Sequence, residues 1–276
     1  MMKMLMRGIF MLACCTLVLS CSKGVSYRIA GTWENGEGKK IYLSEIVGNK
    51  EFRAVDSAVV APGFTFLLKG NVDRVQKMVL VYNTDKRKEI IVDGEPMNVM
   101  FEETTKEWKG KPTTSVTVTC TGNKEQEILE KGSTLKTTIS FMQLGKMMAA
   151  SQADYSDPVA VDSLKRVFAL LDSSLMAAVN NYMDSARNSY ASTYFFESHL
   201  MDNYTFEEVQ GFYNKLTDRV KQSVPGIELK KKIDEMGMVS VGGVAPNFKA
   251  TTPSGRELSL YDLRGRVVLL DFWASW

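Results

Sequence analysis

The stretch Val267–Trp276 reads V-V-L-L-D-F-W-A-S-W and decides how the carboxyl-terminal part of the chain is expected to fold. Its apolar run over residues 267–272 is nearly continuous, whereas a strand with one solvated face alternates apolar and polar residues. A nearly continuous run is typical of a central strand in a parallel sheet, which is buried on both faces. The stretch therefore predicts a buried strand over Val267–Phe272.

The residues before this stretch have the pattern of the opening of a separate α/β domain. The segment Gly242–Phe248 is followed by a turn at Thr252–Arg256 and by the segment Glu257–Leu263. The patterns G-x-x-A-P-x-F, x-G-x-x-L-S-L-x-D-L-x-G-R and V-V-L-L-D-F-W-A-S-W together resemble the start of the TlpA/ResA-like and AhpC/TSA-like thioredoxin superfamily. We therefore expect residues 238–276 to be the start of a thioredoxin-like α/β fold, truncated before its redox motif.

The resemblance implies a Cys-x-x-Cys pair directly after Trp276, and hence no catalytic residue within the chain. In that superfamily the pair lies at the amino end of a helix, whose dipole stabilises a thiolate. F-W-A-S-W is more similar to the flank of a W-C-x-x-C reductase than to the lead into a peroxidase cysteine. The resemblance thus makes Trp273, Ala274, Ser275 and Trp276 the active-site flank, with simple packing as the alternative for Trp273.

A segment of this length lacks the neighbouring strands and covering helices of a thioredoxin core. An unpaired strand with high β-propensity and little charge is an aggregation hazard. We therefore expect the chain to be a fragment of a longer protein.

Residues 21–121 are expected to form an antiparallel β domain, a sandwich or a barrel. About eight short alternating segments are separated by turn signals such as Asn35–Gly38 and Ala61–Gly63. The order Y-x-I-x-G, I-Y-L and V-D-S-A-V-V-x-x-G-x-F-x-F-x-G resembles a small β domain of uncharacterised role that precedes thioredoxin-like domains in envelope lipoproteins of Gram-negative bacteria. The residues that carry the resemblance are Tyr27, Ile29, Gly31, Ile41, Tyr42, Leu43, Asp56, Ser57, Gly63, Phe64, Phe66 and Gly70.

Residues 122–237 are expected to be helical. Three helix starts are indicated by Asn123 with Gln126, by Asp157 before Pro158, and by Thr205 with Glu208. Apolar residues recur at spacings of three and four along the second helix, so that one of its faces is apolar: Val161, Leu164, Phe168, Leu171, Leu175, Val179 and Tyr182. We also expect a helix over residues 189–200, a break at Pro225–Gly226, and a last helix over Ile227–Met236.

The first twenty residues have the pattern of a bacterial lipoprotein signal peptide. Lys3 and Arg7 precede the apolar segment Gly8–Leu19, which is too short to span a hydrocarbon core of roughly 30 Å. Its end, Val18-Leu19-Ser20-Cys21, resembles the lipoprotein box, so Cys21 is the expected lipidation site. The alternative is an ordinary cleaved signal with an incidental cysteine. Two or three acyl chains at about 0.8 kcal/mol per buried CH₂ would anchor the protein durably.

Composition and motif content argue against several classes of function. A net charge of +2, with no basic stripe, argues against a nucleic-acid partner. Once the signal peptide is removed and Cys21 is lipidated, Cys120 is the only free thiol, so no intramolecular disulfide is expected. The chain contains no phosphate-binding loop, no G-x-S-x-G elbow, and no metal-ligand spacing, so neither a cofactor nor a metal is expected.

Three single residues have both a functional and a structural interpretation, and the structural one is favoured for each. Cys120 ends the alternating segment Val116–Cys120 and is expected to be a small buried residue rather than a reactive thiol. Asp56 has no histidine partner nearby and is expected to lie at a turn or a sheet edge. His199, the only histidine, lies among aromatic residues and is expected to be a packing residue.

Two functions remain open. The first is the amino-terminal part of a lipid-anchored envelope thiol–disulfide oxidoreductase, which is inactive alone and whose partners are protein disulfides and the membrane. Ser22 stands where an aspartate would indicate inner-membrane retention, so the outer membrane, facing the periplasm, is favoured. The second is a non-enzymatic envelope lipoprotein whose β domain binds a partner or ligand.

Overall fold

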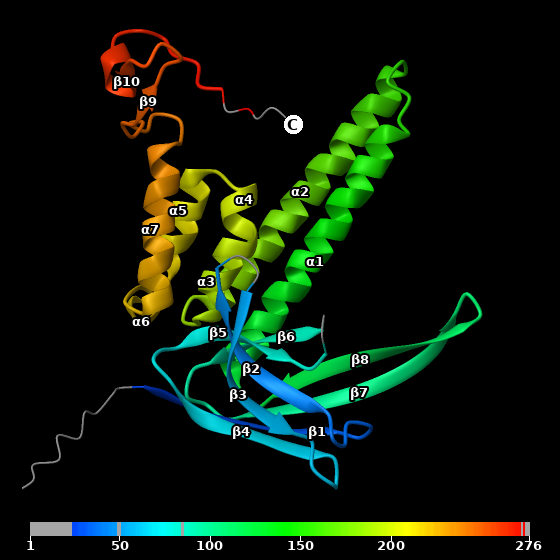
Figure 1. Cartoon of the computed structure of the whole chain (residues 1–276). Coiled ribbons are helices and arrows are strands. Elements are labelled where there is room, and N and C mark those ends of the chain that lie inside the picture. The colour runs from blue at the N-terminus through cyan, green and yellow to red at the C-terminus, as the bar shows by residue number, and fades with distance from the viewer. Residues whose placement is uncertain (1–23, 49–50, 84–85, 272, 274–276) are drawn as a thin grey trace, which may run out of the picture.

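The computed structural model describes residues 24–48, 51–83, 86–271 and 273. A β part, a helical part and a small carboxyl-terminal hairpin follow one another along the chain (Figure 1). The strands of the β part are β1 (Val25–Trp33), β2 (Lys40–Val47), β3 (Glu51–Val59), β4 (Thr65–Val72), β5 (Gln76–Val81), β6 (Arg87–Val92), β7 (Met97–Trp108) and β8 (Lys111–Thr121). The eight segments predicted to be strands are therefore confirmed.

The strands form two four-stranded sheets, in the orders β4-β1-β7-β8 and β3-β2-β5-β6. Every pair is antiparallel except β1 and β7, which pair in parallel with Ile29 opposite Met97. The prediction of a purely antiparallel arrangement is wrong for this pair. Strands that are far apart in sequence are joined only by tertiary packing, which a local pattern does not encode.

Both sheets contribute to one apolar core because each strand directs alternate side chains inward. On β7 these are Met97, Val99 and Phe101, and all three are buried. Trp33 of β1 stacks on Phe101 with ring centroids 4.8 Å apart, and its indole N–H donates to Glu103 at 2.8 Å. A buried aromatic side chain contributes about 1.5–3 kcal/mol by its removal from water.

Strands β7 and β8 continue past the sheet as a projecting two-stranded ribbon (Figure 1). The sequence pattern predicts these strands only over residues 97–101 and 114–121. The structure extends the first to Trp108 and starts the second at Lys111, and the turn residues Lys109 and Gly110 have φ of 51° and 73°. A two-residue hairpin turn of this kind matches strand twist. Because both ribbon faces are exposed, no apolar alternation marked the extra residues.

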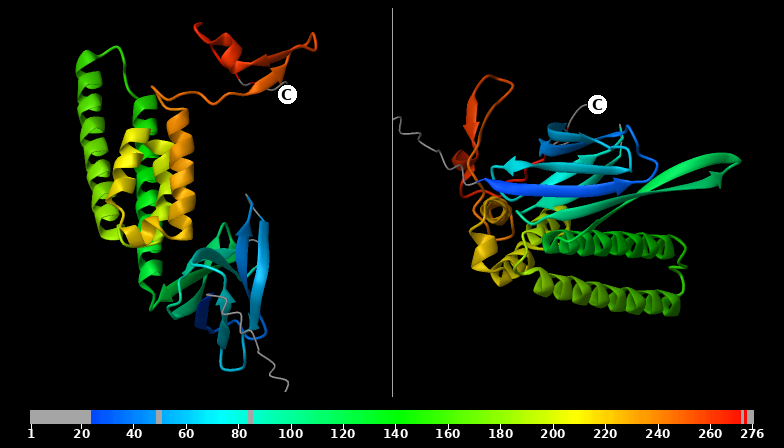
Figure 2. Two further views of the ribbon diagram at one scale, coloured as in Figure 1. Left: turned by 90° about the vertical axis from the view of Figure 1, so that its left-hand side faces the viewer. Right: turned by 90° about the horizontal axis from the view of Figure 1, so that it is seen from below.

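The helical part begins with two long helices, α1 (Lys124–Ser151) and α2 (Pro158–Ala186). It continues with α3 (Ala191–Phe195), a π-helical turn (Phe196–Leu200), α4 (Met201–Asn203), α5 (Phe206–Lys215), α6 (Asp218–Lys221) and α7 (Val224–Met238). Figure 2 shows α1 and α2 running side by side, with α5 and α7 beside one end of the pair. The second core lies where these helices meet, around Val179, Phe196 and Val209.

The three predicted helix starts are confirmed by their capping bonds. The Asn123 side chain accepts from the Gln126 N–H at 2.8 Å, and the Asp157 side chain accepts from the Val159 N–H at 2.9 Å. Thr205 and Glu208 form a reciprocal capping box. Each bond satisfies an amide at a helix start that has no partner within the helix.

One helical prediction is wrong. Pro225 and Gly226 do not break a helix but lie in the first turn of α7, where a proline needs no N–H partner. Ser223 caps that helix by accepting from the Gly226 N–H at 3.2 Å. The helix expected over residues 189–200 is confirmed: α3 continues without a break into the π-helical turn Phe196–Leu200 and α4.

The carboxyl-terminal part contains the two-stranded sheet of β9 (Lys249–Thr251) and β10 (Glu257–Ser259) and the 3₁₀ turn Leu260–Leu263. The strand predicted over 267–272 is absent from its described part, because residues 267–271 have no regular structure. Val267 and Leu269 are almost fully exposed. Within the described residues no strand pairs with this segment, so its backbone groups gain no ladder bonds.

Candidate functional site

In the segment before the predicted active-site flank, one asparagine side chain bonds two stretches of the chain together. Asn247 Oδ1 accepts from Ser259 Oγ at 2.7 Å and from the Tyr261 N–H at 3.1 Å. Asp262 Oδ2 accepts from the Ser259 N–H at 2.9 Å, which closes a capping box on the 3₁₀ turn. Asn247, at the variable position of A-P-x-F, thus bonds this stretch to Ser259 and Tyr261 of the L-S-L-x-D-L stretch.

The predicted site residues themselves are largely outside the part of the chain that the structure describes. This holds for the lipidation site Cys21 and for Ala274, Ser275 and Trp276. Trp273 is described and is 79% exposed, and it belongs to no helix or strand. The structure therefore assembles no catalytic geometry from the predicted residues.

Cys120 is buried on β8, opposite Val99 of β7, as expected for a small core residue. Burial in the apolar core raises the pKa of its thiol to about 11. Because the thiolate is the nucleophile, this cysteine is protonated and inert near neutral pH. The interpretation of Cys120 as a core residue is confirmed.

His199 is buried between two aromatic rings. Its ring centroid lies 5.2 Å from that of Phe195 and 5.9 Å from that of Tyr204. Burial lowers the pKa of the imidazole, so it is neutral at pH 7. Its Nε2 has no hydrogen-bond partner in the structure, and no group of three metal-ligating side chains is found among the described residues. The packing role is confirmed, although one ring nitrogen is unsatisfied.

Asp56 lies on β3, an outermost strand of its sheet, as expected for an edge residue. It accepts from the Tyr27 hydroxyl at 2.9 Å and from the Ser57 N–H at 2.7 Å. Burial, together with this carboxylate, raises the pKa of Tyr27 to about 12. The Tyr27 bond thus joins β3, at the edge of one sheet, to β1, an inner strand of the other.

A buried glutamate that the sequence did not reveal holds the helices together. Glu125, 7% exposed, accepts from Ser189 Oγ at 2.5 Å and from the Ala191 N–H at 3.3 Å. Arg219 donates to the same carboxylate at 3.3 Å. A polar cavity of about 670 Å³ adjoins these groups. The carboxylate is engaged on both oxygens, so this cluster is structural rather than a catalytic acid or base.

The helical part is bonded to the open edge of a sheet. The Gln126 side chain accepts from the Ile91 N–H at 3.0 Å and donates to the Glu89 carbonyl at 3.2 Å. It thereby replaces a neighbouring strand along β6, the outermost strand of its sheet. The Tyr194 hydroxyl accepts from the Lys77 N–H of β5 at 2.8 Å. These bonds hold the β part and the helices in a fixed orientation.

Comparison with known proteins gives partial matches of two kinds, one to a family model and several to thioredoxin-like proteins. The family model "Domain of unknown function (DUF4369)" matches residues 27–129, which span the β part and the start of α1. The thioredoxin-like protein YneN of Bacillus subtilis is 47% identical over 38 residues. The thiol-disulfide oxidoreductases ResA of Bacillus anthracis and Bacillus cereus are each 42% identical over 38 residues.

Each of these matches covers 14% of this chain and 22% of the relative, so the chain spans less than a quarter of the curated relatives' length. No solved structure matches. The chain thus combines a DUF4369 match with a short stretch of similarity to thioredoxin-like proteins. None of the described helices is long and apolar enough to cross a membrane.

Proposed function

We propose that this chain is the amino-terminal part of a lipid-anchored envelope thiol–disulfide oxidoreductase of thioredoxin type. The observation that carries the proposal is the 38-residue similarity to thiol-disulfide oxidoreductases at 42% identity. The bonded network of Asn247, Ser259 and Asp262 supports it, because it gives the resembling motifs a common local structure. The reacting dithiol belongs to the parent protein and follows Trp276.

The proposed chemistry is thiol–disulfide exchange. The first cysteine thiolate attacks a sulfur of a substrate disulfide, which forms a mixed disulfide and releases one substrate thiolate. The second cysteine then attacks the mixed disulfide, which releases the other substrate thiolate and leaves the enzyme oxidised. Cys120 takes no part, because it is buried and protonated. Trp273 and Trp276 flank the dithiol.

In this proposal the β part and the helices form a spacer between the anchor and the redox domain. The bonds of Gln126 and Tyr194 to β6 and β5 support this role, because a spacer of fixed shape needs fixed junctions. The anchor is Cys21, modified through its thiol after cleavage behind Ser20. The protein then lies in the cell envelope, facing the periplasm from the outer membrane.

The redox proposal is tested by reading the gene beyond codon 276 and by assaying disulfide reduction. We expect a Cys-x-x-Cys pair in the next dozen codons. We expect the parent protein to reduce insulin disulfides and the 276-residue chain to show only the background rate. A continuation without two closely spaced cysteines leaves the non-enzymatic lipoprotein with a partner-binding β domain as the alternative.

The anchor proposal has its own test. Wild-type protein expressed in a Gram-negative host should incorporate a labelled fatty acid and fractionate with membranes. Cys21→Ala should do neither, whereas Cys120→Ala should behave as the wild type. Labelling that persists in Cys21→Ala would refute the assignment.

A further inference from the structure

The far half of the α1–α2 hairpin exposes an unusual amount of apolar surface. Beyond the helical core no other described helix or strand lies beside these two helices, and their connection lies at the free end (Figure 2). Seven large apolar side chains of these helices are between 46% and 74% exposed there: Phe141, Leu144, Met147, Met148, Val159, Val167 and Leu170. Seven such residues within two helical segments need an explanation, because soluble proteins rarely leave contiguous apolar patches in water.

Helical spacing places most of these residues on one face, which we call the uncharged face. On α1 it follows Thr134, Thr138, Phe141, Gly145 and Met148. On α2 it follows Ala160, Ser163, Val167, Leu170 and Ser174. No charged residue interrupts either row. Lys146, which pairs with Asp172 at 2.5 Å, extends from the seam between the two helices and borders this face.

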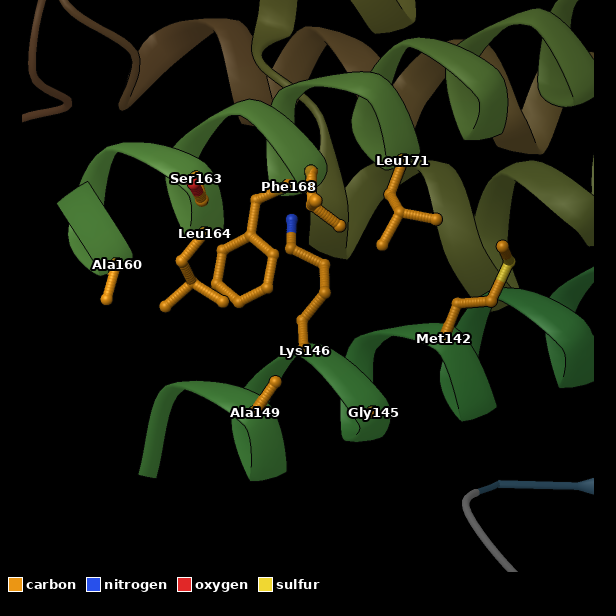
Figure 3. A pocket seen from close by; sticks show the side chains of 10 residues that line it. Met142, Gly145, Lys146, Ala149, Ala160, Ser163, Leu164, Phe168 and Leu171 are labelled. Atoms are coloured by element: carbon orange, nitrogen blue, oxygen red, sulfur yellow. The ribbon is translucent and has the colours of Figure 1, made fainter. Parts of the chain in front are cut away.

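The middle of the uncharged face is hollow. Gly145 and Ala149 of α1 face Ala160 and Ser163 of α2 across a cavity of about 540 Å³, which is lined mainly by apolar atoms (Figure 3). Small side chains on both helices leave room for the ridge of another helix. Larger side chains border this groove, so the same face carries both a groove and the ridges that would fill one.

The large side chains of this face supply more than half of the area that a stable dimer buries. Phe141, Met148, Val167 and Leu170 leave roughly 500 Å² in water, if a fully exposed one offers ~200 Å², against about 800 Å² per partner in a standard interface. Lack of charge is typical of the central part of homodimer interfaces. A face with both ridge and groove can pair with its own copy about a two-fold axis.

We propose that the uncharged face of the α1–α2 hairpin binds a second copy of this chain. The two hairpins pack face to face and form a four-helix bundle. Val167 and Leu170 of one copy lie against the groove at Gly145 and Ser163 of the other. The inference uses no redox residue, so it stands apart from the proposed function.

The test measures the mass of the purified full chain by analytical ultracentrifugation. We expect a dimer for the wild type. The double variant Phe141→Glu/Leu170→Glu should be a monomer, with dimer affinity at least ~100-fold weaker, because carboxylates would be buried without partners. Lys165→Glu, on the charged side of α2, is the matched control and should leave the dimer intact. Circular dichroism checks that each variant is folded.

Cysteine cross-linking tests the same face without disrupting it. Ser163→Cys should form a covalent dimer on mild oxidation, whereas Lys165→Cys should give only the background of the unsubstituted chain. A wild type that stays monomeric at ~100 μM, or equal cross-linking of both variants, would overturn the proposal. If the uncharged face instead binds a lipid surface or another part of the chain, the wild type will stay monomeric in this experiment.

Discussion

At the scale of single residues, the junction between the β part and the helices depends on side chains that bond to an edge strand where the backbone of a neighbouring strand would otherwise do so. The Gln126 amide has one acceptor and two donors, so it can satisfy both an N–H and a carbonyl of an unpaired strand. It does so at Ile91 and Glu89, and it is fully buried. A single glutamine therefore covers part of an edge that would otherwise be open to another chain.

Gln126→Ala should destabilise the protein by about 1–3 kcal/mol, because it leaves a buried strand N–H without its acceptor. Urea unfolding followed by circular dichroism measures this change. The control is Gln210→Ala, which removes an exposed bond to Asn214 and should change stability by less than about 0.5 kcal/mol. Equal effects of the two substitutions would mean that the Ile91 and Glu89 bonds contribute little.

The raised pKa of Cys120 gives a pH dependence. Below the thiol's ordinary pKa, both the folded and the unfolded chain carry a neutral thiol. As pH rises from about 9 towards 11, the unfolded chain ionises while the folded core keeps the proton, so stability falls. In Cys120→Ala this part of the loss should be absent. Unfolding midpoints at pH 8 and pH 10.5 compare the two proteins.

Alkylation provides a second readout for Cys120. Iodoacetamide at pH 8 should modify it only after denaturant is added, and mass spectrometry distinguishes it from the other cysteines. Rapid modification of the folded protein would contradict the assignment of an inert core thiol.

At the scale of elements, the helix starts could be predicted because their chemistry is local. Asn123, Asp157 and Thr205 each accept from an amide two or three residues further along the chain. The role of Glu125 could not be predicted, because its partners Ser189 and Arg219 are 64 and 94 residues away. The parallel pairing of β1 with β7 has the same cause: the two strands are far apart in sequence.

Pro225–Gly226 shows why a strong local signal can be misread. The pair suggested a break, yet Ser223 supplies an N-cap and the proline occupies the first turn of α7. Gly226 then lies against the end of α6: a Cβ there would come within 1.9 Å of the Val220 carbonyl oxygen. The glycine is required by close packing between two helices, not by a turn.

Gly226→Ala should therefore cost about 1–3 kcal/mol of stability, because α6 and α7 must move apart to admit the methyl group. Gly211→Ala is a matched control within α5, where a Cβ meets no atom within 4 Å. That change should stabilise the protein by up to about 1 kcal/mol, since alanine favours a helix interior. Thermal or urea unfolding separates the two outcomes, and a neutral Gly226→Ala would show that the helices adapt freely.

At the scale of the whole molecule, the described residues form two hydrophobic cores, and the carboxyl-terminal part contributes to neither of them. The β core and the helical core each bury a set of large apolar residues. Residues 267–271 are apolar enough for a third core but lie in water. The sequence pattern predicts that such a segment forms a strand when other elements bury it. Whether the strand forms depends on neighbouring strands that pair with it, and the described residues supply none.

Hydrogen exchange tests whether the segment Val267–Asp271 becomes a strand in the parent protein. In the 276-residue chain its amides should exchange at nearly the rate of an unstructured peptide, because they have no acceptors among the residues that the structure describes. In a longer parent that supplies neighbouring strands, the same amides should be protected ~10³-fold or more, whereas those of β7 should be alike in both proteins. Equal fast exchange in both would show that the segment is not a central strand, and the thioredoxin-like interpretation of the carboxyl-terminal part would lose its structural basis.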